Sequence, residues 1–422
     1  MKKRLLTVKK RLAKDGILRT ILFTLYSFFY GIASAAYVSL VLKRKEIIRN
    51  KVVFSSNPDF SDNAKSLFLF LQNAHPEYQY VWLVKEGFDP ERCKGYQNTE
   101  IAFINSNRHH GPSMKALKDI GTAQYLLFTH GSPVRYLQKK DRQLVVNLWH
   151  GCGYKEIQKT GKSYIAANPF DYALVPGPVF IETKYKFWGC RKDQILTLGY
   201  PRYDLFFQES EKAVSFTNTM KNNGEDRIII WMPTFRNTGT GLYPEESNAE
   251  NYDLPLLTSD AQLDALNHYC AEHSMVICIK RHPYQIEYSG EKRNYTNIRF
   301  ISNADLVDRN IELYSLLKYT DALITDYSSV AIDYILLNKP IAFSLDDYEH
   351  YKSTRGFVFE SPLDYMPGNH MFSFEDLMTF IEQVSAGRDE FKNERERLMP
   401  VVHNVCDNYS ERLWTFIKDL EK

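Results

Sequence analysis

The stretch from Asn147 to Lys155, NLWHGCGYK, joins the end of an apolar run to a histidine that two glycines follow. The residues from Leu144 to Leu148 have the composition of a short buried strand. Glycine beside a polar group is typical of places where another group approaches the backbone closely. The stretch therefore predicts a strand that ends in an active-site loop.

Two later segments have the same arrangement. Met275 to Lys280 is a strand-like run that continues into Arg281, and Asp321 to Ile324 continues into Thr325. In open parallel α/β sheets, ligands bind beyond the carboxyl ends of the strands. Strand ends of this kind in both halves of the chain predict a cleft between two sheets.

Strand-like runs alternate with helical or turn-rich segments throughout the chain, which predicts parallel sheets covered on both faces. In the first half, the expected strands are 52–54, 80–84, 101–104, 123–128, 144–148, 172–175 and 195–198, with a helix at 64–71. In the second half, strands are expected at 227–231, 275–280, 298–301, 322–325 and 341–343, and helices at 260–272, 311–319 and 328–337. The expected fold class is α/β, with two Rossmann-like doubly wound domains. By analogy with known folds, two such domains in tandem suggest a GT-B-like architecture.

The 422 residues suit two domains of roughly 200 residues each, with appendages. We expect a basic and apolar segment at 1–50, a first Rossmann-like domain at 51–207 and a polar linker at 208–226. A second Rossmann-like domain is expected at 227–373, followed by C-terminal helices at 374–422 that brace the two domains.

Charge and cysteine content narrow the class of protein. A formal net charge of +2 argues against nucleic acid as a partner. The six cysteines have no metal-like spacing, so we expect reduced thiols in a cytosolic compartment. Asp346 and Asp347 follow a strand, but adjacent acids point in different directions and are more often solvated loop residues. We therefore expect neither a metal nor a cofactor.

The N-terminus has the composition of a membrane-associating helix. Residues 1–15 carry seven cations against one acid, and the apolar run at 17–42 holds a single charge, Arg19. This run is long enough to cross a bilayer. More cations follow between Lys43 and Lys51, and cations at both ends favour a helix that lies on an anionic membrane surface. A true span and a cleaved signal peptide are the alternatives.

The candidate residues that follow these strands each have a chemical and a structural interpretation. A neutral His150 can accept a proton from a hydroxyl near neutral pH, or it can simply hydrogen-bond within a loop. Arg281 and His282 can neutralise charge on a leaving diphosphate, or they can be solvated loop residues. Arg236, which follows a Pro-Thr-Phe strand end, has the same two interpretations.

The segment from Thr325 to Ser329 precedes an expected helix. Serine is a strong N-cap residue, and capping alone would explain Ser328 and Ser329. The exposed N–H groups of a helix N-terminus also bind phosphate, and hydroxyl groups add donors there. The two interpretations are compatible.

Several motifs, in this order and spacing, resemble the CDP-glycerol glycerophosphotransferase family of teichoic acid and capsule synthesis. They are Trp149-His150-Gly151, Gly199-Tyr200-Pro201-Arg202, Pro233-Thr234-Phe235-Arg236, His282-Pro283 and Thr325-Asp326-Tyr327-Ser328-Ser329, followed by Asp333 and Lys339-Pro340. The resemblance extends over about residues 52–343. The family commonly has Thr-Pro where this chain has Cys152 and Gly153.

The resemblance implies a GT-B enzyme at the cytoplasmic face of the cell membrane, attached peripherally or monotopically. It would transfer an alditol phosphate from CDP-glycerol, or from CDP-ribitol, to a hydroxyl of a lipid-linked saccharide acceptor and release CMP. The first domain would lie on the acceptor side, and the second would bind the CDP-alditol. The catalytic residues would be His150, as the base, and His282, at the donor diphosphate. The implied substrate-binding residues are Gly151, Lys155, Arg202, Thr234, Arg236, Arg281, Thr325, Asp326, Ser328 and Ser329.

Two other functions fit the same pattern. One is a GT-B glycosyltransferase that uses a nucleotide sugar. The other is a catalytically silent membrane-surface binding protein that keeps the fold, against which the presence of His150 and His282 argues.

Overall fold

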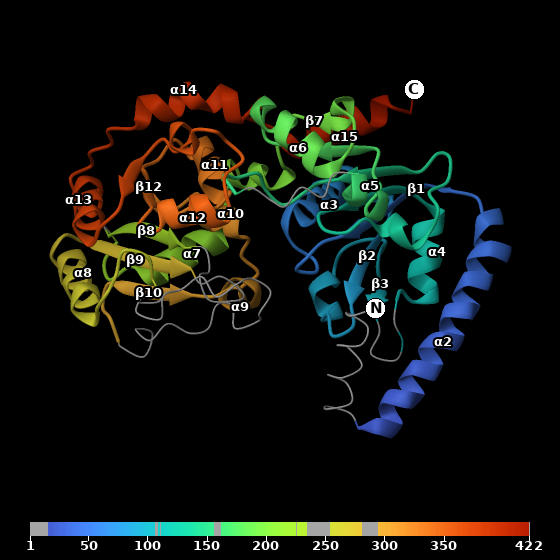
Figure 1. The fold of residues 1–422 in the computed structure, drawn as a ribbon. Helices are drawn as coiled ribbons and strands as arrows, with labels where there is room; N and C mark the ends of the chain where they lie inside the picture. The colour runs from blue at the N-terminus through green and yellow to red at the C-terminus, as the bar shows by residue number, and fades with distance from the viewer. Residues whose placement is uncertain are drawn as a thin grey trace. The chain divides into compact units, whose positions relative to one another are not determined.

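The computed structural model describes residues 16–105, 109, 111–155, 162–224, 226–233, 254–280 and 294–421. These residues form two compact units (Figure 1). As far as the ranges are described, unit 1 comprises Met1–His150, Thr160–Leu174 and Trp188–Leu196, and unit 2 comprises Gly151–Lys159, Val175–Phe187 and Thr197–Lys422. The chain thus passes from unit 1 to unit 2 for the first time at the peptide bond that follows His150.

Unit 1 contains a parallel sheet in the order β3-β2-β1-β4-β5-β6-β7. The strands are β1 (Ile48–Ser55), β2 (Gln79–Lys85), β3 (Thr99–Asn105), β4 (Ala123–Phe128), β5 (Leu144–Asn147), β6 (Tyr172–Leu174) and β7 (Ile195–Leu196). Val52, Val53 and Phe54 of the central strand β1 are fully buried, as expected for a strand that is covered on both faces. The strand order reverses between β1 and β4, which is the switch point where such sheets bind ligands.

The helices of unit 1 are α2 (Ile17–Leu40), α3 (Asp62–Ala74), α4 (Met114–Thr122) and α5 (Lys162–Ala167). Short 3-10 turns lie at η1 (Leu42–Arg44), η2 (Pro90–Cys93), η3 (Pro133–Tyr136) and η5 (Lys192–Gln194). Helix α2 stands at the side of unit 1 (Figure 1), and Leu18 and Phe29 on it are 71% and 64% exposed. Among the described residues, only the helix Ile17–Arg44 has the length and apolar composition that would allow it to cross a membrane.

Unit 2 contains a second parallel sheet in the order β10-β9-β8-β11-β12-β13. Its strands are β8 (Arg227–Met232), β9 (Met275–Lys280), β10 (Ile298–Ile301), β11 (Ala322–Thr325), β12 (Ile341–Ser344) and β13 (Asn369–Met371). Numbered within the unit, this order is that of the dinucleotide-binding Rossmann sheet, and its switch point lies between β8 and β11.

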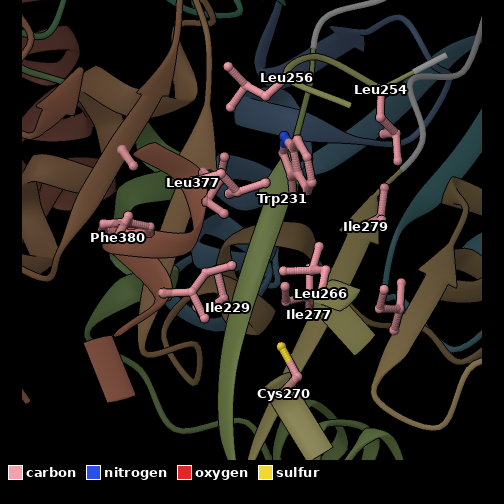
Figure 2. Packing of buried hydrophobic residues seen from close by; sticks show 14 of the residues in the cluster. Ile229, Trp231, Leu254, Leu256, Leu266, Cys270, Ile277, Ile279, Leu377 and Phe380 are labelled. Atoms are coloured by element: carbon pink, nitrogen blue, oxygen red, sulfur yellow. The ribbon is translucent and has the colours of Figure 1, made fainter. Parts of the chain in front are cut away.

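Unit 2 also contains helices and short turns. They are η4 (Pro178–Phe180), α6 (Ile181–Trp188), η6 (Pro201–Phe206), α7 (Glu211–Met220), α8 (Asp260–Glu272), α9 (Asn303–Asp308), α10 (Leu313–Leu317), α11 (Val330–Tyr334), η8 (Ile335–Leu337), α12 (Tyr348–Thr354), η9 (Pro362–Tyr365), α13 (Phe374–Ser385), α14 (Lys392–Val402) and α15 (Tyr409–Asp419). On one face of the sheet, Trp231 and Ile277 pack with Leu266 of α8 and with Leu377 and Phe380 of α13 (Figure 2). This cluster anchors the strands whose ends carry the candidate site.

The structure confirms all the expected strands and the expected α/β class, with two Rossmann-like sheets. It differs from expectation at 208–226, where α7 buries Ala213, Phe216 and Met220. The segment is therefore a packed helix of unit 2 for much of its length, instead of a polar linker. The sequence also gave no sign of β13, because Asn369-His370-Met371 is short and has a single apolar residue. The domain bounds, and the bracing role of 374–422, stay predictions.

Candidate functional site

The switch point of unit 1 brings the carboxyl ends of three strands together. Ser55 is in register with Phe128, and Phe128 with Asn147. The pairing continues beyond the strands, because Thr129 N donates to Ser55 O at 3.0 Å and Leu148 N to Phe128 O at 2.7 Å. The residues that follow β4 and β5 therefore leave the sheet side by side.

A buried asparagine fixes the backbone before His150. Asn63 of α3 is fully buried, and its Nδ2 donates to the carbonyl oxygens of Leu148 and Trp149 at 3.1 and 2.9 Å. Trp149 has a φ of 53°, and its N–H donates to Asn147 Oδ1 at 3.0 Å. Backbone conformations of this kind are uncommon outside glycine and persist where the surroundings hold them. These bonds set the direction in which His150 leaves the strand.

The His150 ring is half-buried among other rings. It lies 3.9 Å from the His130 ring at an interplanar angle of 14°, and 4.1 Å from the Trp149 ring, centroid to centroid. Its Nδ1 is 3.5 Å from the carbonyl oxygen of Thr129. A carbonyl only accepts, so this contact favours a proton on Nδ1 and leaves the lone pair on Nε2. That is the tautomer required of a general base acting through Nε2.

The glycine loop that follows His150 belongs to unit 2. A Cβ at Gly153 would lie 2.9 Å from the backbone N and Cα of Ser329, and one at Gly151, where φ is 139°, would lie 2.5 Å from Ser329 Oγ. Lys155 forms an antiparallel bridge with Phe357. The close approach expected at the glycines is therefore made by Ser329 of the same unit.

The turn after β11 is tied to neighbouring strands. Thr325 is fully buried, and its hydroxyl donates to Met232 O, at the end of β8, at 2.8 Å. Asp326 is fully buried as well. Ser328 and Ser329 are half-buried, and α11 begins after them at Val330. Ser329 occupies the N-cap position, but its side chain makes no capping hydrogen bond, so the capping interpretation is wrong for this serine.

A buried ion pair lies beneath this loop and turn. Arg202 Nη2 is 2.7 Å from Asp333 Oδ2, with side-chain exposures of 7% and 0%. The hydroxyls of Tyr203 and Tyr314 also donate to Asp333. Burial, with the charge of Asp333, raises the pKa of Tyr203 well above its ordinary value, which keeps this phenol a donor. Because a Cβ at Gly151 would lie 3.4 Å from Arg202 Nη2, the ion pair also supports the glycine loop.

Cys152 and Lys184, which lie in the same neighbourhood, are also buried. Cys152 Sγ is 3.2 Å from the hydroxyl of Tyr200, and burial raises the pKa of the thiol, so Cys152 is poorly suited to act as a nucleophile. Burial lowers the pKa of the nearby Lys184. The six cysteines all lie in the described part of the chain, and none of them is in a disulfide there.

Four predicted residues lie outside the described residues: Thr234, Arg236, Arg281 and His282. The strands that lead to them, β8 and β9, are described and end at Met232 and Lys280. Burial lowers the pKa of Lys280 to about 8, and its Nζ donates to Asn303 Oδ1 at 2.6 Å.

Sequence reasoning missed several residues that the structure brings to the site. His130 was missed, although Phe128-Thr129-His130-Gly131 repeats the pattern of an apolar run, a histidine and a glycine. Asn63 and the tyrosines around Asp333 give no sequence signal, because their contacts join segments far apart in the chain. No group of His, Cys, Asp or Glu side chains suited to a metal occurs among the residues that the structure describes.

Two parallel sheets with the Rossmann strand order, each with polar residues after the strands at its switch point, define a GT-B-like α/β protein. Residues 36–418 match the family model described as CDP-Glycerol:Poly(glycerophosphate) glycerophosphotransferase. The chain belongs to this family.

Curated relatives and a solved structure agree with this assignment. The chain is 27% identical to the teichoic acid ribitol-phosphate polymerase TarK of Staphylococcus aureus over 81% of its length and 64% of that protein. It is 30% identical to a teichoic acid ribitol-phosphate primase of Bacillus spizizenii over 60% of its length and 64% of that protein. It is 28% identical to a teichoic acid glycerol-phosphate primase of Bacillus subtilis, over 63% of its length and 65% of that protein. The chain thus matches less than two thirds of each of these relatives.

A variant of the wall teichoic acid polymerase TagF soaked with CDPG has a similar fold. The TM-score is 0.71 at 20% identity, and the match covers 99% of this chain and 98% of that one.

Proposed function

We propose that the protein transfers an alditol phosphate from a CDP-alditol to a hydroxyl of a lipid-linked saccharide acceptor in teichoic acid or related cell-surface polymer synthesis. The observation that carries the proposal is His150, held at the end of β5 with Nδ1 directed at a carbonyl. Further support comes from the family and from relatives named for glycerol-phosphate and ribitol-phosphate transfer. Glycerol phosphate is the alditol phosphate that the family description favours.

The reaction is a substitution at the phosphorus that carries the alditol. The acceptor oxygen bonds to this phosphorus while its proton passes to Nε2 of His150. The bond from the same phosphorus to the oxygen it shares with the cytidylyl phosphate breaks, and CMP leaves with both electrons of that bond. Each turnover extends the acceptor by one alditol phosphate, and His150 returns its proton to water.

The donor is assigned to the strand ends at the switch point of unit 2. Ser328 and Ser329, both half-buried after β11, would donate hydroxyl bonds to the phosphates. Arg236, Arg281 and His282 follow β8 and β9 and would offset the charge that develops on the departing CMP. Gly151, Lys155, Arg202, Thr234, Thr325 and Asp326 complete the proposed binding residues.

We infer attachment to the anionic cytoplasmic leaflet through α2, and we expect the membrane surface to present the acceptor. Leu18, Phe28 and Phe29 are 71%, 63% and 64% exposed, so the helix offers apolar surface to a bilayer. Cations from Lys43 onward follow the helix, and each basic residue near such a surface contributes about 1 kcal/mol.

A donor panel tests the proposed reaction. CMP release is measured with CDP-glycerol, CDP-ribitol and UDP-sugars, with and without a lipid-linked saccharide acceptor, using wild type and His150→Gln. His268→Gln is the control, because the His268 side chain is 76% exposed on α8. We expect acceptor-dependent CMP release from a CDP-alditol that only His150→Gln abolishes. Turnover of a UDP-sugar alone would instead indicate a glycosyltransferase, and no turnover of any donor would indicate a silent binding protein.

A further inference from the structure

His130 faces His150 from the adjacent strand end and has no role in the reaction described above. His130 follows β4 and His150 follows β5, and these strands are hydrogen-bonded neighbours. The two rings are stacked, 3.9 Å apart and 14° from parallel. Both histidines are half-buried.

Thr129 contacts both histidines. Its hydroxyl oxygen is 3.0 Å from His130 Nδ1, and its carbonyl oxygen is 3.5 Å from His150 Nδ1. Thr129 is fully buried, and its N–H donates to Ser55 O. The Thr129 side chain therefore contacts the His130 ring, and the Thr129 backbone carbonyl contacts the His150 ring.

This arrangement restricts the His150 imidazole. The torsion that turns an imidazole about its bond to Cβ is broad, so a histidine ring keeps one orientation only where its neighbours impose it. Here the stacked His130 ring restricts the plane of the His150 ring, and the Thr129 carbonyl favours the orientation in which Nδ1 lies beside it. Removing the His130 ring leaves space into which the His150 ring can turn, so that Nδ1 leaves the Thr129 carbonyl and Nε2 changes position with it.

We propose that His130 is a positioning residue for the transfer reaction: its stacked ring keeps the His150 ring oriented with Nδ1 toward the Thr129 carbonyl. The proposal rests on the proposed function. Catalytic groups that shift by about 1 Å can lose on the order of 100-fold in rate, so the supporting ring need not touch substrate to matter. The competing interpretation is that the stack contributes packing alone.

The test compares His130→Ala, which removes the ring, with His130→Phe, which keeps a ring of similar size without nitrogen. His75→Ala is the matched control, because His75 also stacks on an aromatic ring of unit 1, 4.7 Å from Tyr78. We expect His130→Ala to lower kcat for CMP release by about 10- to 100-fold, with KM for the CDP-alditol changed by less than about twofold. His130→Phe is expected to recover most of kcat, and His75→Ala to behave as wild type.

A second measurement does not depend on activity. Long-range 1H–15N correlation of selectively labelled histidines in the full chain reports the tautomer of His150, assigned by comparison with His150→Gln. We expect the Nδ1-protonated form in wild type and in His130→Phe, and a mixture in His130→Ala. Full activity of His130→Ala, a loss in His130→Phe as large as in His130→Ala, or an unchanged tautomer in His130→Ala would overturn the proposal. Absence of CMP release by wild type would contradict the proposed function, while the tautomer would still test the positioning.

Discussion

Asp333→Asn tests the buried ion pair under the glycine loop. The Asp333 carboxylate is fully buried and accepts hydrogen bonds from Arg202, Tyr203 and Tyr314. Asparagine has nearly the same shape but no charge, and one of its two terminal groups is a donor that faces other donors. The substitution therefore leaves the guanidinium of Arg202, 7% exposed, without its carboxylate partner.

The size of the effect follows from the burial of both partners. Removing one partner of a buried ion pair costs about 3 to 5 kcal/mol, because the remaining charge is desolvated and uncompensated. For a unit of this size, about 2 to 4 °C of melting temperature correspond to 1 kcal/mol. Asp333→Asn should therefore lower the melting temperature of unit 2 by roughly 6 to 20 °C.

A double-mutant cycle separates the ion pair from other losses. Melting is followed by near-ultraviolet circular dichroism for wild type, Asp333→Asn, Arg202→Met and the variant with both changes. Methionine keeps much of the apolar stem of Arg202 but removes the charge, so the double variant should be destabilised by clearly less than the sum of the single variants. A shift of less than about 2 °C for Asp333→Asn, or strict additivity in the cycle, would refute the reasoning.

Four further predictions follow from the site and its surroundings. His150→Ala should bind CDP-glycerol with normal affinity in calorimetry yet release CMP roughly 100-fold more slowly or worse, and an equal loss of binding would make the histidine a phosphate ligand instead. Gly153→Ala should lower both activity and melting temperature, because its Cβ would lie 2.9 Å from the backbone of Ser329, and a variant with wild-type values would contradict that close packing. Deleting residues 1–45 should abolish binding to anionic vesicles while donor affinity is kept, and binding of wild type should weaken in high salt; resistance to both salt and alkaline washing would indicate a spanning helix. Burial lowers the pKa of His403 to about 4, so below about pH 6.5 the unfolded chain binds a proton that the folded chain does not bind. The stability contributed by neutral His403 is complete above that pH, and the free energy of unfolding should fall by at most about 3 kcal/mol toward pH 4. Urea unfolding should show this loss in wild type and not in His403→Gln.

The strands were predictable because their environment is uniform. A central strand of a parallel sheet is buried on both faces, so it is recognised as a continuous apolar run. The expected strands 123–128, 275–280, 298–301 and 322–325 have the bounds that the structure shows for β4, β9, β10 and β11. β13 escaped this rule because it is only three residues long and Met371 is its single apolar residue.

Helix α7 was missed for a different reason. Its polar residues suggested a linker, but Ala213, Phe216 and Met220 recur at intervals of three and four residues and form one buried stripe. A periodicity analysis would have detected this stripe, whereas average polarity concealed it.

The candidate site was predictable where it depends on strand ends and not where it depends on contacts between distant segments. His150 and Ser329 follow strands, and topology alone brings strand ends to one edge of a sheet. Arg202 and Asp333 are separated by 131 residues, and nothing local to either one indicates that they form a buried pair. His130 lies between these cases, because its position after β4 was visible but its stacking on His150 required the register of β4 against β5.

One short segment carries the proposed base, His150, and the glycine loop that packs on Ser329 of the proposed donor turn. Asn63, Thr129 and His130 fix the segment up to His150 within unit 1. From Gly151 onward, Ser329 and Phe357 fix it within unit 2. At a single peptide bond, the chain therefore passes from a residue held by the first sheet to a loop packed on the turn after β11. The close packing within unit 2 gives a physical reason for glycines at both 151 and 153, since a Cβ at these positions would lie 2.5 Å and 2.9 Å from Ser329.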